Sequence, residues 1–359
     1  MEHSPGPLLA AVLRGIWRQQ PCPAPLSEGD LDCLTPLLLR SGAGGLGWSR
    51  VRQTALRFAP AAIELHQAYR FHTLRAALYE QAVQRYVSAL QAAGIDVLLF
   101  KGWAIARLYP ESALRPYGDI DLVVAPGHHA SAAAVLQGVR FADCDVDLHP
   151  SLGSMSDHAW ESLYARAHII SLRGVNVRIL APEDHLVLLC RHFLRHNAWR
   201  PLWLCDIAAA LEARPADFDW GLCLGSNRRR AGWVACTLGL AAQLLDAHVE
   251  DTPIASHANH LPSWLKPAVL RQWDRCVGPG HLGTIVRYVT SHWRQPRHLL
   301  RHARQRWDMP TAATFALRAP LNAFPRSPFQ LALALTHIPA WCQQLWHHWA
   351  GNLPLSGRH

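Results

Sequence analysis

The segment from residue 95 to residue 150 constrains the fold most, because short apolar runs alternate there with turn residues. The run VLLF at residues 97–100 precedes Lys101 and Gly102, and the later runs GDIDLVV and DVDLHP are rich in valine, isoleucine and leucine. Runs of this length and composition are typical of β-strands, and the stretches between them have the pattern of short helices. We therefore expect an α+β fold with a small mixed sheet and flanking helices over residues 95–180.

Two aspartates, Asp119 and Asp121, stand two residues apart in GDIDLVV. Because side chains alternate between the faces of a strand, both carboxylates should lie on one side of the sheet. Adjacent carboxylates raise each other's pKa, and a divalent cation between them removes the conflict. Magnesium prefers oxygen ligands and leaves coordination positions for substrate phosphates. An isolated Asp-x-Asp is more often a turn or strand-edge feature, so the metal hypothesis depends on the surrounding sequence.

A third carboxylate on a neighbouring strand would complete a site for two metal ions roughly 4 Å apart. Asp143, Asp145 and Asp147 all fall on one face of the strand predicted over residues 140–148, so the alternation does not choose among them. His149 follows on the same strand, where it either orients Asp147 or caps the strand.

Lys101 and Gly102 lie between a predicted strand and a predicted short helix, an order that presents backbone N–H groups to phosphate. The chain has only two lysines, Lys101 and Lys266, so a lysine on this turn favours a specific role. The loop before Asp119 brings Arg115 close to it in sequence. We predict that Lys101, Gly102 and Arg115 bind a triphosphate, with a solvated loop arginine as the alternative for Arg115.

The order of these motifs resembles a known family. The motifs occur in the order KG, LYP, R-x-x-GDIDLVV and VDLHP. They are followed at residues 181–212 by APEDHLVLLCRHFLRHNAWRPLWLCDIAAALE. Over roughly residues 69–246 the chain is similar to the uncharacterised nucleotidyltransferase family of the polymerase-β-like nucleotidyltransferase superfamily. The resemblance implies a polymerase-β-like core in which Asp119, Asp121 and Asp147 hold two Mg²⁺ ions, the match to VDLH selecting Asp147.

The activity implied by the resemblance is transfer of a nucleoside monophosphate from a nucleoside triphosphate to an acceptor hydroxyl, with release of pyrophosphate. The sequence does not identify the acceptor, which can be a small molecule, a peptide, a protein or an RNA. Trp103 stands where the superfamily has its second small residue, and the spacer before Asp119 is longer than usual. Trp103 and the less regular C-terminal tail favour the alternative of a catalytically silent member that binds nucleotide or a partner protein.

The rest of the chain reads as helical. We divide it into an N-terminal helical region (1–94), the nucleotidyltransferase core (95–180), a helical domain (181–277) and a C-terminal helical tail (278–359). Ser27 is a predicted helix cap and Ser41–Gly47 a predicted turn. Residues 60–93 form one long helix or a broken pair, whose predicted apolar face consists of Ile63, Ala68, Phe71, Leu74, Leu78, Ala82, Tyr86 and Leu90.

The formal net charge of +9 fits a phosphate-bearing partner, whether nucleotide, nucleic acid or an anionic membrane surface, although base composition of the gene also explains an arginine excess. The nine cysteines show no C-x-x-C spacing and no secretory signal opens the chain, which predicts reduced thiols and a cytoplasmic protein. We expect no transmembrane segment. The aromatic segment 338–351 either packs on a core or contacts a membrane surface.

Two further clusters leave alternatives open. His192 and His196 have a spacing that can bind zinc, but without a third ligand nearby they are better candidates, with Arg195 and Asp206, for lining a cleft. The run RRR at residues 228–230 is either a solvated helix start or a contact to an acceptor RNA.

Overall fold

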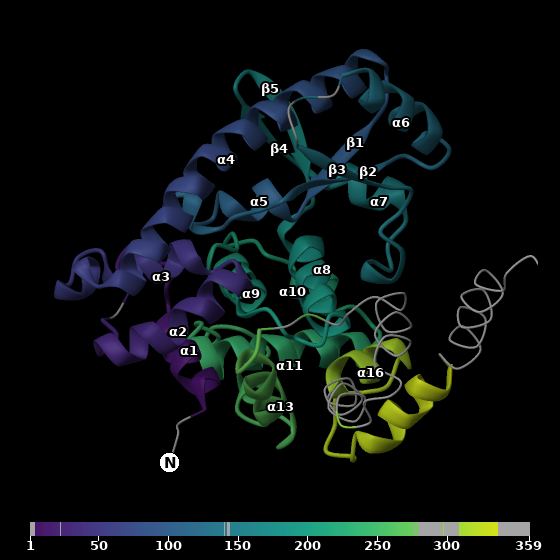
Figure 1. The fold of residues 1–359 in the computed structure, drawn as a ribbon. Coiled ribbons are helices and arrows are strands. Elements are labelled where there is room, and N and C mark those ends of the chain that lie inside the picture. Colours follow the sequence, from purple (N-terminus) through teal and green to yellow (C-terminus); the bar gives the residue numbers. More distant parts are fainter. Residues whose placement is uncertain are drawn as a thin grey trace, which may run out of the picture.

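The computed structural model describes residues 4–21, 23–139, 141, 144–276, 278, 297 and 309–336. Figure 1 shows a five-stranded sheet above a body of helices, and the long helix α4 (Pro60–Ala92) runs beside both parts. The predicted α+β fold is therefore confirmed. Within the described ranges, no helix is long and apolar enough to cross a membrane. The aromatic segment 338–351 and Asp143 lie outside the described residues.

The chain begins with helices that lie next to α4. They are α1 (Pro5–Leu13), α2 (Glu28–Ser41), α3 (Gly44–Val51) and the 3-10 turn η1 (Ala55–Phe58). Ser27 caps α2 as predicted: its side chain accepts a hydrogen bond from the Asp30 amide, and the Asp30 carboxylate accepts one from the Ser27 amide. This reciprocal pair satisfies amides that the first helical turn leaves free.

The predicted turn at residues 41–47 is wrong for most of its length. Only Gly42, with φ of 76°, has the left-handed conformation of a turn, and α3 begins two residues later. The glycines of α3 serve close packing instead. A Cβ on Gly45 would lie 2.8 Å from the carbonyl oxygen of Ala113, so only glycine lets α3 approach that backbone.

The helix α4 is a single helix of 33 residues, but its predicted apolar face is partly wrong. Steps of four residues exceed a full helical turn by about 40°, so the predicted stripe drifts around the helix. One constant face contacts both the helical body and the sheet, and Ile63, Phe71, Leu74 and Leu78 lie outside it and are exposed. The side chains buried on α4 are Ala61, Ala62, Leu65, Ala76, Tyr79, Ala82, Val83, Tyr86, Val87 and Leu90.

The sheet has the strand order β3-β2-β1-β5-β4. Strand β1 pairs antiparallel with β2 and parallel with β5, β2 pairs parallel with β3, and β4 pairs antiparallel with β5. The sheet is therefore mixed, as predicted, although β3 begins later than the predicted residue 140, which lies outside the described residues. The strands are β1 (Val97–Phe100), β2 (Asp119–Val124), β3 (Asp145–His149), β4 (His168–Leu172) and β5 (Val175–Ile179).

The two faces of the sheet are covered differently. Leu99 and Leu122 lie on the face that packs against α4 and α6 (His129–Gly138). Phe100 and Val123 lie on the opposite face, against the 3-10 turn η3 (Gly153–Met155), α7 (Trp160–Ala165) and α8 (Pro182–Arg195). Because side chains alternate, Asp121 shares the face of Val123 and is directed toward α8 and the helical body.

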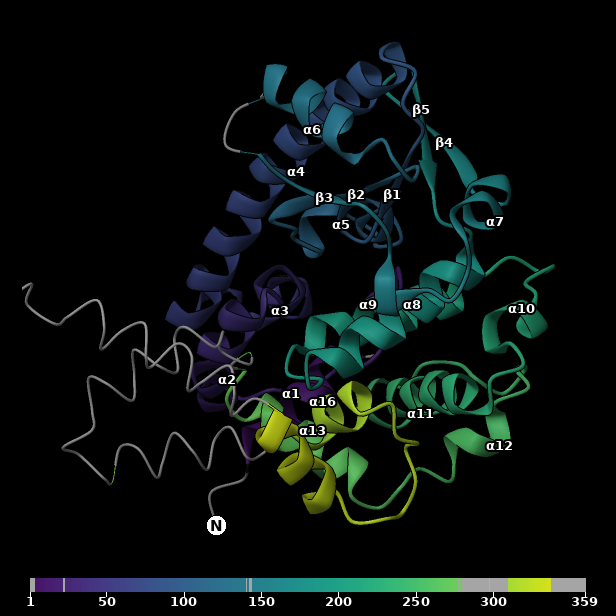
Figure 2. The ribbon, with the colours of Figure 1, turned by 90° about the vertical axis from the view of Figure 1, so that its right-hand side faces the viewer.

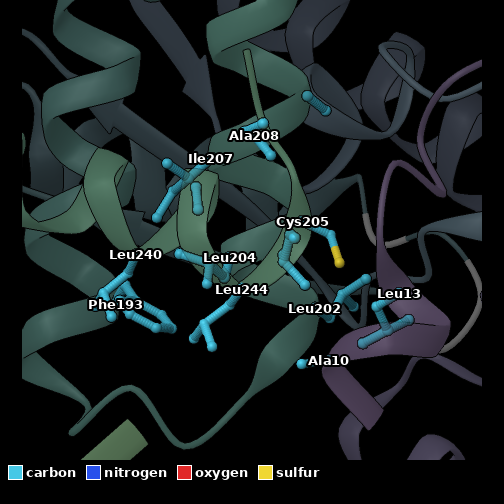
Figure 3. Packing of buried hydrophobic residues seen from close by; sticks show 14 of the residues in the cluster. Ala10, Leu13, Phe193, Leu202, Leu204, Cys205, Ile207, Ala208, Leu240 and Leu244 are labelled. Atoms are coloured by element: carbon cyan, nitrogen blue, oxygen red, sulfur yellow. The ribbon is translucent and has the colours of Figure 1, made fainter. Parts of the chain in front are cut away.

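The helical body after α8 consists of α9 (Pro201–Glu212), α10 (Trp220–Leu224), α11 (Arg228–Leu245), α12 (Ala255–Ala258), α13 (Leu265–Trp273) and α16 (Pro310–Ala316), and residues 327–336 are also helical. Figure 2 shows α8 and α9 between the sheet and α11. Leu13 of α1, Leu202 of α9 and Leu244 of α11 belong to one hydrophobic cluster, part of which Figure 3 shows. The N-terminal helices and the helices after residue 181 therefore share a core.

One buried ion pair connects the segment before β2 to this helical core. Arg115 donates to Asp206 of α9 through Nε, at 3.0 Å from Oδ1, and through Nη2, at 2.7 Å from Oδ2. The Tyr109 hydroxyl donates to Asp206 Oδ1 at 2.9 Å. The Asp206 side chain is fully buried and that of Arg115 is 7% exposed. A bidentate pair this deeply buried fixes the strand entrance against α9.

Replacing Asp206 with asparagine should strongly destabilise the protein, because it leaves the buried Arg115 charge without a counter-charge. We expect the free energy of unfolding to fall by roughly 3–5 kcal/mol in urea denaturation. Asp217→Asn is the control, because Asp217 is exposed and should change stability little. The double variant Arg115→Gln with Asp206→Asn should lose less than Asp206→Asn alone, and an equal or larger loss would contradict the ion-pair account.

Candidate functional site

The pairing of β2 with β3 brings the predicted carboxylates together. The two strands run parallel, with Asp121 directly opposite Asp147 and Asp119 directly opposite Asp145. Of the three acids that the alternation left open, Asp145 and Asp147 are both on this face, and only Asp147 stands beside the buried Asp121. Parallel pairing places opposed side chains on the same side of the sheet, so their carboxylates are neighbours.

Among the described residues, Asp121, Asp147 and His149 form the group whose side chains could hold a metal ion. One ligand atom from each lies within 4.8 Å of the others. The His149 Nε2 atom is 3.1 Å from Asp147 Oδ2 and 3.5 Å from Asp121 Oδ1. Sequence reasoning gave His149 only an orienting or capping role. The signal that could have found it is the strand period, which places it on the face of Asp147.

Asp119 belongs to the same strand face but not to this group. Asp119 is the first residue of β2 and is exposed, whereas Asp121 is only 4% exposed. Surrounding protein nevertheless desolvates the Asp119 carboxylate, and this together with the charge of Asp121 raises its pKa. The structure thus separates the predicted triad into a neighbouring pair, the buried Asp121 and the exposed Asp147, and a third carboxylate at the start of β2.

Lys101 supplies positive charge beside the buried Asp121. Its Nζ atom donates to Asp121 Oδ1 at 2.9 Å and lies over the Phe100 ring. Burial opposes ionisation of Asp121, but the adjacent His149 imidazole and the Lys101 ammonium group outweigh it and lower the pKa of Asp121. The carboxylate therefore stays charged although it is buried.

The backbone at Lys101 is in a conformation that non-glycine residues rarely adopt, with φ of 53°. The Lys101 amide donates to Nε2 of the buried His185 on α8 at 3.0 Å, and Gly102 follows with φ of 33°. Burial, with the positive charges of Arg107 and Arg115, lowers the pKa of His185 to about 3. His185 is therefore a neutral acceptor that holds the strained turn in place.

The indole of Trp103 is not among the carboxylates. It is 7% exposed and packs in the cluster of Leu99 and Leu122, on the α4 and α6 face of the sheet. The face that carries Asp121 is the opposite one. Trp103, which differs from the small residue of the superfamily, is therefore part of the hydrophobic core on that face of the sheet. It belongs to the helix α5 (Gly102–Ala106), which is only five residues long.

Two other groups lie elsewhere than expected. Arg115 was predicted to bind phosphate, but its guanidinium group is 7% exposed and bonded to Asp206, whose charge outweighs the effect of burial and raises the pKa of Arg115. His192 packs edge-on against Trp203 and His196 packs tilted against it, and no third metal-ligating side chain joins them in the described chain. Burial holds the pKa of His192 well below its usual value, which fits an uncharged packed ring.

The donor set fits a divalent cation. Two carboxylates and an imidazole converge on one point, and one of the carboxylates is exposed enough to reach a ligand from solvent. Magnesium uses carboxylate oxygens, and manganese also accepts an imidazole nitrogen. The geometry can therefore hold a metal beside the lysine-bearing turn.

The protein should lose stability in acid through His185. Its pKa is lowered from 6.5 to about 3 on folding, so the unfolded chain takes up the proton first. The stability that comes from the neutral His185 is fully present above the pKa of the unfolded chain. It is lost as the pH falls toward the pKa of the folded protein, with a slope of up to about 1.4 kcal/mol per pH unit. We expect His185→Gln to show a shallower loss of unfolding free energy between about pH 6 and pH 4.

The control for this measurement is His168→Gln, which removes an exposed histidine from β4 and should keep the slope of the parent. Urea denaturation at several pH values gives the slopes. A parent-like slope in His185→Gln would contradict a neutral, buried His185 in the folded state.

Comparison with known proteins gives a family for this chain. The family model described as uncharacterised nucleotidyltransferase matches residues 27–142 and 140–246. No curated protein sequence matches the chain. A crystal structure of an antigenic nucleotidyltransferase-like protein from Paracoccidioides brasiliensis is similar with a TM-score of 0.37 and 14% identity, covering 50% of this chain and 97% of that one. With more than half of its residues matched by the family model, the chain belongs to the uncharacterised nucleotidyltransferase family.

Proposed function

We propose that this protein transfers a nucleoside monophosphate from a nucleoside triphosphate to an acceptor hydroxyl and releases pyrophosphate. The observation that carries the proposal is the pairing of Asp121 with Asp147 across β2 and β3, beside a lysine on a strained glycine turn. Family membership supports the reaction class. Proteins of this reaction class need carboxylates for divalent cations and a cationic group for the triphosphate.

The acidic residues have distinct places in this proposal. Asp121 and Asp147 hold the divalent cation, with His149 against both carboxylates. Asp119, at the exposed start of β2, completes a site for a second ion, and we propose Mg²⁺ for both. When bound, such ions stabilise the negative charge that develops on the reacting phosphate and lower the pKa of the attacking hydroxyl.

The turn at Lys101 and Gly102 binds the triphosphate. The Lys101 ammonium group, now on Asp121, is close enough to the carboxylates to contact the phosphates held there. Arg115 acts differently from the sequence prediction: through Asp206 it fixes the backbone immediately before β2, and so it positions the carboxylates. His185 keeps the Lys101 amide in its place.

The reaction then requires one displacement. The acceptor hydroxyl gives its proton to a carboxylate of the site, and its oxygen forms a bond to the α-phosphorus. The bond between the α-phosphorus and the bridging oxygen breaks, and pyrophosphate leaves with that electron pair. The Lys101 ammonium group offsets charge on the leaving pyrophosphate. The acceptor is a hydroxyl of a small molecule, peptide, protein or RNA, and we place the reaction in the cytoplasm, where the seven described cysteines are free thiols.

A second candidate is a nucleotide-binding member without transfer activity. Two observations favour this candidate. Lys101 neutralises the charge of Asp121, and Asp119 lies outside the group of Asp121, Asp147 and His149. Both candidates predict stabilisation of the fold by triphosphate and magnesium. Only the first predicts pyrophosphate release that depends on an acceptor.

The proposal predicts that Asp121→Asn and Asp147→Asn abolish transfer. Each variant removes a carboxylate from the group that holds the cation, and we expect activity to fall by roughly 10²-fold or more. The measurement is pyrophosphate release, with transfer of label from α-labelled ATP, CTP, GTP or UTP to components of a cell extract. Magnesium and triphosphate should stabilise the parent by about 2.7 kcal/mol when the ligand is in hundredfold excess over its dissociation constant. The two variants should lack this stabilisation.

The matched control is Asp145→Asn, which removes an exposed carboxylate two residues away on the same strand face. It should retain both the transfer and the stabilisation. Retention of magnesium-dependent stabilisation by Asp121→Asn would contradict the metal site itself. If the parent binds triphosphate but transfers no label in any extract, the second candidate is favoured.

A further inference from the structure

A second candidate binding site lies along the last turns of α8. An open cavity of about 540 Å³ is bordered by η3 and the loop after it, the last turns of α8, the start of α11, and α16. Figure 2 shows α16 beside α8 and α11. None of Lys101, Asp119, Asp121, Asp147 and His149 lines this cavity, so it is separate from the carboxylate site.

The cavity is lined by an excess of positive charge. Its lining contains five arginines and one acidic residue, Asp157. The arginines are Arg191, Arg195, Arg229, Arg230 and Arg318. Five guanidinium groups against one carboxylate leave four positive charges uncompensated within the lining. Like charges repel one another at this spacing, so a bound anion would stabilise the arrangement.

Two of these arginines are buried and incompletely bonded. Arg191 and Arg230 are each 6% exposed, and both share Asp157, at 3.0 Å from one carboxylate oxygen and 3.4 Å from the other. The Nε atoms of both arginines are buried without a hydrogen-bond partner. An unsatisfied donor on a buried charged group is unfavourable by about 1–3 kcal/mol or more. The exposed remainder of each side chain lines the cavity, where a ligand with acceptor oxygens would add compensating negative charge.

The three other arginines are exposed at the cavity rim. Arg195, Arg229 and Arg318 have no carboxylate partner in the described chain. The run at residues 228–230 is therefore divided: Arg230 enters the cavity wall, Arg229 reaches its rim, and Arg228 does not line it. Asn227 caps α11 here, so the positive end of an 18-residue helix also faces the cavity.

This lining selects a class of ligand. Guanidinium groups bind phosphate through paired N–H donors, and a cavity of about 540 Å³ is within the range of sizes that hold a small molecule. Four uncompensated charges match an anion with at least two phosphate groups. We propose that the cavity is a binding site for a small molecule carrying two or more phosphate groups, and this inference does not rest on the proposed transfer reaction.

The site is connected to the carboxylate centre by two elements. His185, which holds the Lys101 turn, and Arg191, in the cavity wall, are six residues apart on α8, about 9 Å along the helix axis. The loop from His149 to Asp157 joins β3 to the cavity. A ligand in the cavity therefore contacts both segments that position the carboxylate site.

The test uses the full chain and inorganic tripolyphosphate, measured by titration calorimetry in EDTA so that divalent cations are absent. The double variant Arg195→Gln with Arg229→Gln should weaken binding at least tenfold. Both residues are exposed, so the fold should persist, which a parent-like melting temperature checks. Arg191 and Arg230 are left in place because their loss threatens the fold.

The matched control is Arg228→Gln, which removes the same charge from the same helical turn outside the cavity lining. It should weaken binding less than twofold, and Asp145→Asn, which lies outside both sites, should leave it unchanged. No heat of binding, or equal weakening by Arg228→Gln, overturns the proposal. Displacement of tripolyphosphate by a short single-stranded RNA of similar or higher affinity also overturns it, because the surface then serves a nucleic acid.

Discussion

The parallel pairing of β2 with β3 is the constraint on which the site depends. A shift of this register by one residue would move Asp147 to the opposite face and place Val146 or Leu148 beside Asp121. The apolar alternation of both strands prevents such a shift, because Ile120, Leu122 and Leu148 are packed against α4 and α6. The same hydrophobic pattern that stabilises the sheet therefore determines which carboxylates meet.

The helical body holds this sheet edge from two directions. Asp206 bonds Arg115 just before β2, and His185 bonds the Lys101 amide just after β1. Both partners come from helices of the shared core, so the turn and the strand entrance are fixed by elements more than eighty residues away in sequence. The unusual φ of Lys101 is compatible with folding because this core stabilises it.

The sequence was sufficient for the strands of the site but not for its electrostatics. Strand alternation correctly predicts that Asp121 and Asp147 share a face, since a period of two needs only local information. It cannot predict that Arg115 is bonded to Asp206, because that pair joins residues 91 positions apart. Nor can it separate Asp119 from Asp121, because their difference in burial arises only in the folded chain, where Lys101 and His149 lie against Asp121. The exposed Phe71 and Leu74 show the same limit on α4.

The distribution of lysine and arginine follows from their different chemistry. The guanidinium group is always charged and forms fixed, paired hydrogen bonds, which suits the static contact of Arg115 with Asp206. The ammonium group of Lys101 is compact, carried on a flexible stem, and bonded to a single carboxylate oxygen. In the proposed reaction, Lys101 leaves Asp121 to contact a phosphate in the same site, and this step needs that mobility. On this proposal, the chain has one of its two lysines where charge has to move and Arg115 where charge has to stay.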